Sequence, residues 1–249
     1  DAMNAYLNWT NRSILPNLEE IIASSSDGAL VSAAQTAYAR LSVLPGTEPL
    51  EKRNEIFDRA WEMNTNANEA RRLVGALIEY PGPATLELLQ KWSSHETFGA
   101  LAKGAVTSME RSIAGVREIQ SGEELKGNKA RVQGDSRAAI NSFLESLTGW
   151  VSPDTWFTWN FKITESGEYA IEVDQATIRK DSSEFVVYLG GKRFDGESQT
   201  TESLEEFSTI ALPGTVSLEA GAIYTLALHA GERVQPRMMD IGSIRLVKK

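Results

Sequence analysis

The spacing of apolar residues changes near residue 120, and this change constrains the fold more than any other feature of the chain. Before it, apolar side chains recur every three to four residues, as in a helix with one buried face. After it, they alternate with polar side chains, as in a strand with one buried face. With 249 residues, the chain is long enough for two domains. We therefore predict a helical domain over 1–119, a linker over 120–127 and a β domain over 128–249.

The helices of the first half are separated by proline and glycine. Asp27, a residue type that favours the N-cap position, precedes an apolar stripe over 30–44. Asn66, followed three residues later by Glu69, predicts a capping box at the start of another helix. An earlier helical pattern, over 2–9, is expected to begin the array.

Two similar helix ends stand at a distance typical of helical repeats. Leu44-Pro45-Gly46 and Tyr80-Pro81-Gly82 are 36 residues apart, a period typical of the helix pairs of an α-solenoid. Several segments resemble HEAT-like repeats of large exported bacterial proteins: Ala37-Tyr38-Ala39-Arg40-Leu41, 52–63, Glu69-Ala70-Arg71-Arg72-Leu73-Val74 and Ala84-Thr85-Leu86-Glu87-Leu88-Leu89. The resemblance implies that this half contacts a partner protein and carries no chemistry.

Two tryptophans of the helical half offer two interpretations. Trp61 and Trp92 each occupy the apolar stripe of a predicted helix. A tryptophan can serve as a platform for a ligand, but at this spacing it more often packs in a core. We therefore expect both side chains to be buried.

The second half contains several short segments in which apolar and polar residues alternate. Gly190-Gly191 between two of them is a signal for a tight hairpin. Many short strands joined by turns predict an antiparallel β-sandwich of the jelly-roll type. The expected inward rows are Phe157, Trp159, Phe161 and Ile163; Tyr169, Ile171 and Val173; Phe185, Val187 and Leu189; Val216 and Leu218; Tyr224, Leu226 and Leu228; and Ile241, Ile244 and Leu246.

An ordered series of motifs in this half resembles a family of carbohydrate-binding-like domains. The motifs are Gly149-Trp150, Pro153-Asp154-Thr155-Trp156-Phe157-Thr158-Trp159, Gly167-Glu168-Tyr169-Ala170-Ile171-Glu172-Val173, Phe185-Val186-Val187-Tyr188-Leu189-Gly190-Gly191, 207–221 and Met239-Asp240-Ile241-Gly242-Ser243-Ile244-Arg245-Leu246. They look like the domains appended to bacterial fucosidases and sulfatases, which are similar to family-6 and family-35 carbohydrate-binding modules. The resemblance implies a galactose-binding-like sandwich that binds a polysaccharide or oligosaccharide outside the cell or in the periplasm.

A sugar-binding site usually pairs an exposed aromatic ring with a few polar side chains. Trp150 precedes the first clear strand, and Trp156 is out of phase with the inward row, so both are candidates for the ring. Asp154 lies between them and can accept hydrogen bonds from hydroxyl groups. Arg193 and Phe194 follow the predicted hairpin and could join the carbohydrate-binding site. The alternative is that Trp150 and Trp156 pack against the sheet.

The related modules often hold a structural calcium between acidic residues near the first and last strands. Asp240 stands in the final segment, but Asn128-Lys129-Ala130 occupies the early position, where an acidic residue would be expected. An ammonium group cannot be a ligand of a hard cation. We expect no cofactor and a local hydrogen-bonding role for Asp240, with a retained calcium as the less favoured alternative.

The composition excludes several classes of function. The net charge is −9, both halves are mildly acidic, and neither carries the basic cluster that binds nucleic acid. The chain contains no cysteine, which removes thiol nucleophiles and disulfides. No apolar run approaches the roughly 20 residues needed to span a membrane. The two histidines, His95 and His229, have no spacing that suggests a metal pair or a triad, so we expect no catalytic activity in this chain.

Two functions remain open. In the first, the chain is an accessory region of a larger exported bacterial protein that recognises or degrades polysaccharide. Asp1-Ala2-Met3-Asn4 lacks the features of a signal peptide, which indicates a fragment of such a protein. In the second, the chain is a protein-interaction scaffold whose sandwich is a degenerate spacer without a sugar ligand.

Overall fold

The computed structural model describes residues 12–134 and 138–249. The chain divides into a helical unit, Asp1–Gly115, and a β unit, Val116–Lys249. This division confirms that helices come first and strands second. The helix predicted over 2–9 lies outside the described residues.

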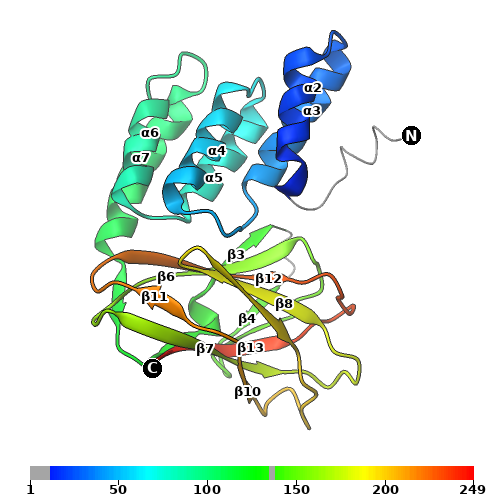
Figure 1. Ribbon diagram of the computed structural model, residues 1–249, viewed down its shortest axis with the longest axis vertical. Coiled ribbons are helices and arrows are strands. Elements are labelled where there is room, and N and C mark those ends of the chain that lie inside the picture. The colour runs from blue at the N-terminus through cyan, green and yellow to red at the C-terminus, as the bar shows by residue number, and fades with distance from the viewer. Residues whose placement is uncertain (1–11, 135–137) are drawn as a thin grey trace. The chain divides into compact units, whose positions relative to one another are not determined.

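The described part of the helical unit forms a short 3-10 helix and six α-helices. Helix α2 packs on α3, α3 on α4 and α5, α4 on α6, and α5 on α7. Figure 1 shows the pairs α2/α3, α4/α5 and α6/α7 side by side. The elements are η1 (Arg12–Ile14), α2 (Leu15–Ser24), α3 (Gly28–Ser42), α4 (Leu50–Glu62), α5 (Ala67–Ile78), α6 (Pro83–Trp92) and α7 (Gly99–Ala114).

The predicted helix starts are largely confirmed. The Asp27 carboxylate accepts hydrogen bonds from the backbone N–H groups of Ala29 (3.0 Å) and Leu30 (3.3 Å) and so caps α3. Asn66 caps α5 through the N–H of Asn68, at 2.8 Å. The prediction that Glu69 completes a capping box with Asn66 is wrong. The Glu69 carboxylate makes an ion pair with Arg72, with an N–O distance of 3.4 Å.

Trp61 and Trp92 form the aromatic centre of the helical unit. Their rings stack with a centroid distance of 4.4 Å and an interplanar angle of 4°. Both side chains are buried. The Trp92 indole Nε1–H donates to the Asp58 carboxylate at 2.9 Å. The prediction of core packing is confirmed.

The β unit consists of two sheets. The six-stranded sheet has the order β1-β6-β12-β8-β9, with β3 also paired to β6: β1 (Arg117–Ile119), β3 (Arg131–Gly134), β6 (Thr155–Ile163), β8 (Glu184–Leu189), β9 (Lys192–Glu197) and β12 (Ile223–Ala230). The seven-stranded sheet has the order β10-β7-β13-β5-β4, with β11 also on β7 and β2 also on β13: β2 (Glu124–Lys126), β4 (Ala139–Asn141), β5 (Ser146–Thr148), β7 (Gly167–Ala176), β10 (Ser208–Ala211), β11 (Val216–Leu218) and β13 (Asp240–Lys248). A short 3-10 helix, η2 (Gly127–Lys129), follows β2.

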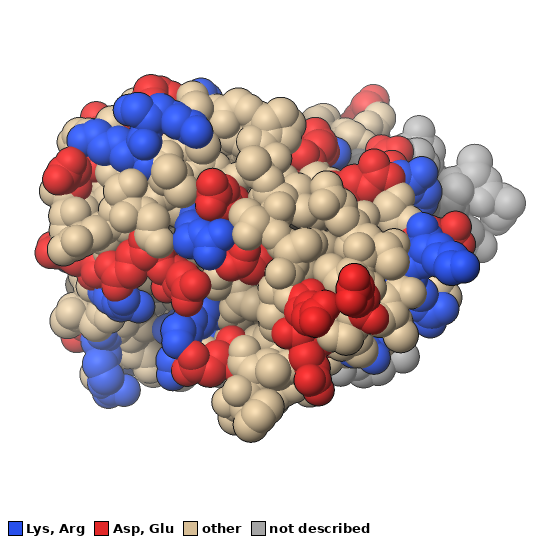
Figure 2. Space-filling model, turned by 90° about the horizontal axis from the view of Figure 1, so that it is seen from below, with Lys and Arg blue, Asp and Glu red and all other residues tan. Residues whose placement is uncertain are grey.

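The strand pairs described in the two sheets are antiparallel, except that β1 runs parallel to β6. Figure 1 shows the two sheets of the β unit facing each other. An antiparallel β-sandwich is therefore confirmed. Figure 2 looks onto the side of the sandwich that carries β7 and β13, where acidic and basic side chains are intermixed rather than sorted into one basic patch.

The linker predicted over 120–127 is wrong. Strand β1 pairs with β6, and β2, which lies within the predicted linker, pairs with β13. Ile119 and Leu125 are buried in the core of the sandwich. The division of the chain therefore falls at Gly115, and the first two short strands belong to the β unit.

The core of the sandwich is built from the inward rows that alternation predicts. All six rows contribute, with Tyr224 only partly buried at the edge of the core. The inward residues Ile241 and Ile244 are three positions apart rather than two, because the register of β13 shifts between Ile241 and Ser243. Gly190 (φ 56°) and Gly191 (φ 76°) both adopt the left-handed conformation that a tight hairpin of this kind requires.

Candidate functional site

Trp150 belongs to the core of the sandwich, so its assignment to a sugar-binding surface is corrected. The side chain is 1% exposed, and its ring meets Phe157 edge-on at a centroid distance of 5.0 Å. Its indole Nε1–H donates to the carbonyl oxygens of Ser152 and Thr155, each at 3.1 Å. These bonds use the polar atom of the ring to hold the loop before β6.

Phe194 is also a core residue, and its assignment to the site is corrected. It lies on β9 opposite Val187, so its ring points into the sandwich and is buried. Arg193, the preceding residue, points outward. Its Nε and Nη2 atoms donate to Asp195 Oδ1 at 2.9 and 2.7 Å.

Trp156 lies outside the core, as its phase on β6 predicts, because it is absent from the inward row of that strand. Its ring is 6.2 Å from the ring of His229 on the neighbouring strand β12. The side chain is only 7% exposed, so little of its ring face is open. The interpretation of Trp156 as outward-facing is correct, but it is not an open platform.

Asp154 is exposed in the turn before β6. Its charge and that of Arg193 both act on the imidazole of His229. Trp156 therefore lies beside His229 on the outer side of the six-stranded sheet, and the charges of Asp154 and Arg193 act on the same imidazole. Trp150 and Phe194, in contrast, are buried in the core of the sandwich.

His229 is held in a neutral form by its surroundings. Desolvation by burial lowers its pKa below the ordinary value of 6.5, and the Arg193 charge acts in the same direction. A bond to the Ala230 carbonyl oxygen, 2.7 Å from Nδ1, and the Asp154 charge act in the opposite direction and are the smaller influence. Nε2 is buried without a hydrogen-bond partner among the described residues.

We expect the β unit to lose stability as the pH falls below about 6.5. Above this pH, His229 is neutral in both the folded and the unfolded chain. Below it, His229 is protonated in the unfolded chain but stays neutral in the folded chain until the pH reaches its lower pKa there. The free energy of unfolding therefore falls by at most about 1.4 kcal/mol per pH unit. Urea unfolding between pH 5 and 8 measures this, and His229→Gln should flatten the dependence above the range where carboxylates titrate. An unchanged slope in His229→Gln would contradict the assignment.

Asp240 takes a local hydrogen-bonding role, as predicted. Its carboxylate accepts from Thr148 Oγ1 at 3.0 Å and from Arg237 Nη2 at 3.1 Å. The Arg237 guanidinium therefore supplies a positive charge beside this carboxylate. Within residues 12–134 and 138–249, no group of three or more acidic or histidine side chains is arranged to hold a metal ion.

Among the described residues, a highly exposed aromatic side chain lies on the β4–β5 hairpin, where the sequence predicts no site. Phe143 is at the turn of this hairpin and is 91% exposed. The Asn141 Oδ1 atom accepts from the N–H groups of Phe143 and Leu144, each at 3.1 Å, which orders the turn. Ile140, on the same hairpin, is half-exposed.

The base of this hairpin is anchored to its neighbours by polar contacts. Lys126 makes an ion pair with Glu145, and the Asn128 N–H donates to the Glu145 carbonyl oxygen at 3.0 Å. The result is an aromatic ring with an open face on an ordered turn, among groups able to hydrogen-bond. The signal that could have found it is a phenylalanine inside the polar turn Asn-Ser-Phe-Leu-Glu-Ser, where packing gives no reason for an apolar ring.

The described residues carry no arrangement that identifies a catalytic site. His95 has a structural role in the loop before α7, because its Nδ1 accepts from the N–H groups of Thr97 and Phe98, each at 3.2 Å. Its ring also meets Trp61 edge-on. Across the part of the chain that the structure describes, no helix is both long and apolar enough to cross a bilayer.

No protein-family model matches the chain, and no curated protein matches it. Solved structures do match over the β unit. A GH26-CBM35 β-(1,4)-mannanase of Podospora anserina is 16% identical over 52% of this chain and 28% of its own, with a TM-score of 0.40. A family 35 carbohydrate-binding module from Clostridium thermocellum is 11% identical over 52% of this chain and 99% of its own, with a TM-score of 0.43.

The similar structures are not confined to carbohydrate-active proteins. The mosquito-larvicidal Cry4Aa toxin of Bacillus thuringiensis is 11% identical over 55% of this chain and 25% of its own, with a TM-score of 0.46. The chain thus spans about a quarter of the length of the mannanase and of the toxin. Identities and TM-scores this low do not transfer those activities to this chain.

Proposed function

We propose that the β unit binds a glycan without cleaving it, as an accessory part of a larger exported bacterial protein that recognises or degrades polysaccharide. The observation that carries the proposal is the Phe143 ring, 91% exposed on an ordered hairpin turn. The ordered series of motifs that resembles carbohydrate-binding-like domains supports it. We assign no catalytic step to this chain. The helical unit, as a short HEAT-like array, is proposed to contact another protein.

An exposed phenylalanine suits a sugar because a pyranose ring offers an apolar C–H face bordered by hydroxyl groups. Burying a phenylalanine side chain contributes about 1.5–3 kcal/mol, which corresponds to about tenfold or more in Kd. The turn is already ordered by Asn141, so binding costs little conformational entropy there. Ile140, on the same hairpin, is a second exposed apolar side chain.

Asp154, Trp156 and Arg193 form the second proposed location for the glycan, on the outer side of the six-stranded sheet. The carboxylate and the guanidinium are exposed, whereas the Trp156 ring is nearly covered. Arg193 is already engaged by Asp195, which lowers the number of free donors. This location therefore offers hydrogen-bonding groups but little ring surface, and Phe143 is the better platform.

We expect Phe143→Ala to weaken glycan binding about tenfold or more, for the burial reason given above. A glycan array identifies the ligand, and affinity electrophoresis in gels of plant and algal polysaccharides measures the retention of each variant. Phe143→Tyr keeps the ring and should retain binding. Ile178→Ala is the matched control, because Ile178 is another apolar side chain, 58% exposed on a different loop, and its loss should change nothing.

The other outcomes are equally informative. If Phe143→Ala binds normally and an Asp154→Ala, Trp156→Ala double variant does not, the site lies on the six-stranded sheet and Phe143 is excluded. If the unaltered chain binds no neutral or acidic glycan, the proposal fails. The alternative, a protein-interaction scaffold with a spacer sandwich, would then be supported by a protein recovered in pull-downs independently of sugar.

A further inference from the structure

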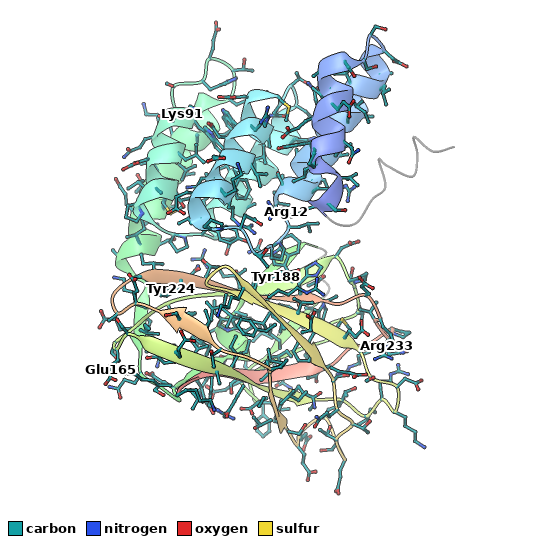
Figure 3. All side chains as sticks on the ribbon, in the orientation of Figure 1. Arg12, Lys91, Glu165, Tyr188, Tyr224 and Arg233 are labelled. Atoms are coloured by element: carbon teal, nitrogen blue, oxygen red, sulfur yellow. The ribbon has the colours of Figure 1, made fainter. Side chains whose placement is uncertain are left out.

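A largely buried cluster of the helical unit joins two arginines to one carboxylate. Arg12, at the start of η1, and Arg53, in α4, both bind the carboxylate oxygen Oε1 of Glu48, which lies in the α3–α4 connection. The Arg53 Nη2–Glu48 distance is 2.8 Å, and Arg53 Nη1 also donates to the Leu44 carbonyl oxygen at 3.2 Å. Figure 3 labels Arg12 in the helical unit. Two guanidinium groups thus share one carboxylate.

Tyr80 completes the cluster without balancing its charge. The Arg53 guanidinium lies 4.4 Å from the centroid of the Tyr80 ring. Burial raises the pKa of the Tyr80 phenol, so the hydroxyl is neutral. The charges of Glu48 and Glu79 also act on this phenol, but Glu48 is the carboxylate that contacts the two arginines. Two guanidinium groups therefore meet a single carboxylate in this contact set.

Several hydrogen-bond donors of this cluster are buried and unused. Arg12 Nε and Nη2 have no partner among the described residues, although Arg12 Nη1 is bound to Glu48. These two atoms form one edge of the guanidinium, the edge that can hold an oxyanion with two parallel hydrogen bonds. The Tyr80 side chain is 9% exposed, and its hydroxyl is also buried without a partner among the described residues. Buried donors of this kind cost free energy unless a partner is bound.

Two helix starts add to the positive potential near these residues. Pro49 precedes α4 and Gly82 precedes α6, and neither helix has a side-chain cap. A Cβ atom on Gly82 would lie 3.5 Å from the Leu50 side chain, so the two helix starts are neighbours. The N-terminal end of a helix carries a partial positive charge and unpaired N–H groups. Positive charge therefore converges on the cluster from side chains and from backbone.

We propose that this cluster, defined by Arg12, Glu48, Arg53 and Tyr80, binds one small oxyanion. The Nε–Nη2 edge of Arg12 is the primary contact, and the two guanidinium groups supply the attraction. Phosphate, sulfate and carboxylate share this chemistry. The site lies within the helical unit and does not depend on whether the β unit binds a glycan.

We expect one molecule of phosphate or sulfate to bind per chain, measured by isothermal titration calorimetry of the full chain in a chloride buffer of matched ionic strength. Arg12→Lys keeps the charge but loses the pair of parallel N–H donors, so binding should weaken about tenfold. Glu48→Gln removes the negative charge that the two arginines share and should strengthen binding. Arg71→Lys is the matched control, because the exposed Arg71 hydrogen-bonds to Asn68 on its own helix, and binding should not change.

Three outcomes decide the proposal. Acetate that binds as tightly as phosphate would identify a carboxylate as the natural ligand, and phosphate or sulfate binding alone would identify a tetrahedral oxyanion. Absence of binding to all three anions, or equal affinity in Arg12→Lys and the unaltered chain, would overturn it. If a variant fails to fold, the second measurement is amide hydrogen exchange in α4 of the unaltered chain. Phosphate should slow this exchange more than chloride does, and unchanged exchange would count against the site.

Discussion

Replacing Trp150 with alanine is expected to lower the free energy of unfolding of the β unit by about 3–5 kcal/mol. The side chain is almost fully buried, and its ring packs edge-on against Phe157. The substitution removes this packing and also leaves the carbonyl oxygens of Ser152 and Thr155 without the indole donor. Urea unfolding, with amide hydrogen exchange in β6 to follow the β unit separately, measures the loss.

The control distinguishes the ring from its polar atom. Trp150→Phe keeps most of the packing but loses both hydrogen bonds, so it should cost less than Trp150→Ala. Phe143→Ala, which removes an exposed ring from the same unit, should change stability by no more than about 0.5 kcal/mol. If Trp150→Ala left stability unchanged and abolished glycan binding, Trp150 would be a ligand residue after all.

Trp150 and Phe194 are both buried in the core, but only the burial of Phe194 could have been predicted from the sequence. The burial of Phe194 could have been predicted, because a two-residue turn at Gly190-Gly191 pairs Leu189 with Lys192 and therefore Val187 with Phe194. Val187 was already assigned to the core, so its partner on the same face had to point inward. Trp150 offered no such signal. Its burial depends on a loop that folds back onto the indole, and loop conformation has no periodicity.

The first strands of the β unit were missed for a related reason. β1 and β2 have three residues each, too few for alternation to be recognised. Their positions are fixed by partners far along the chain, β6 and β13. The polar, glycine-containing stretch 120–127, which includes β2, therefore has the sequence pattern of a linker. Long strands such as β6 and β7 were predictable because alternation over nine or ten residues specifies which face is buried.

Trp156 and Phe143 differ in the same way, because one lies on a strand with a readable alternation and the other lies in a turn. The phase of β6 correctly predicts that Trp156 faces away from the core, but it does not predict how much of the ring is covered. Phe143 was overlooked because it lies in a turn, where neither helical nor strand spacing applies. Exposure is a tertiary property, so the two rings could be ranked as platforms only from the structure.

Replacing Trp61 with alanine is expected to destabilise the helical unit by about 3–5 kcal/mol. The side chain is buried and stacks on Trp92, and it meets Phe98 edge-on at a centroid distance of 6.0 Å. Alanine would leave a cavity between α4 and α6. Amide hydrogen exchange of α4 to α7 in the full chain measures the effect on this unit separately from the sandwich.

The stacked pair provides its own matched control. Trp92 donates its indole N–H to Asp58, whereas the buried Trp61 Nε1 atom has no partner among the described residues. Both phenylalanine substitutions keep an aromatic ring, but only Trp92→Phe removes a hydrogen bond. Trp92→Phe should therefore cost about 1 kcal/mol more than Trp61→Phe. Equal losses would show that the Asp58 bond contributes nothing, and negligible loss in Trp61→Ala would contradict a core role and revive the interpretation of Trp61 as a ligand platform.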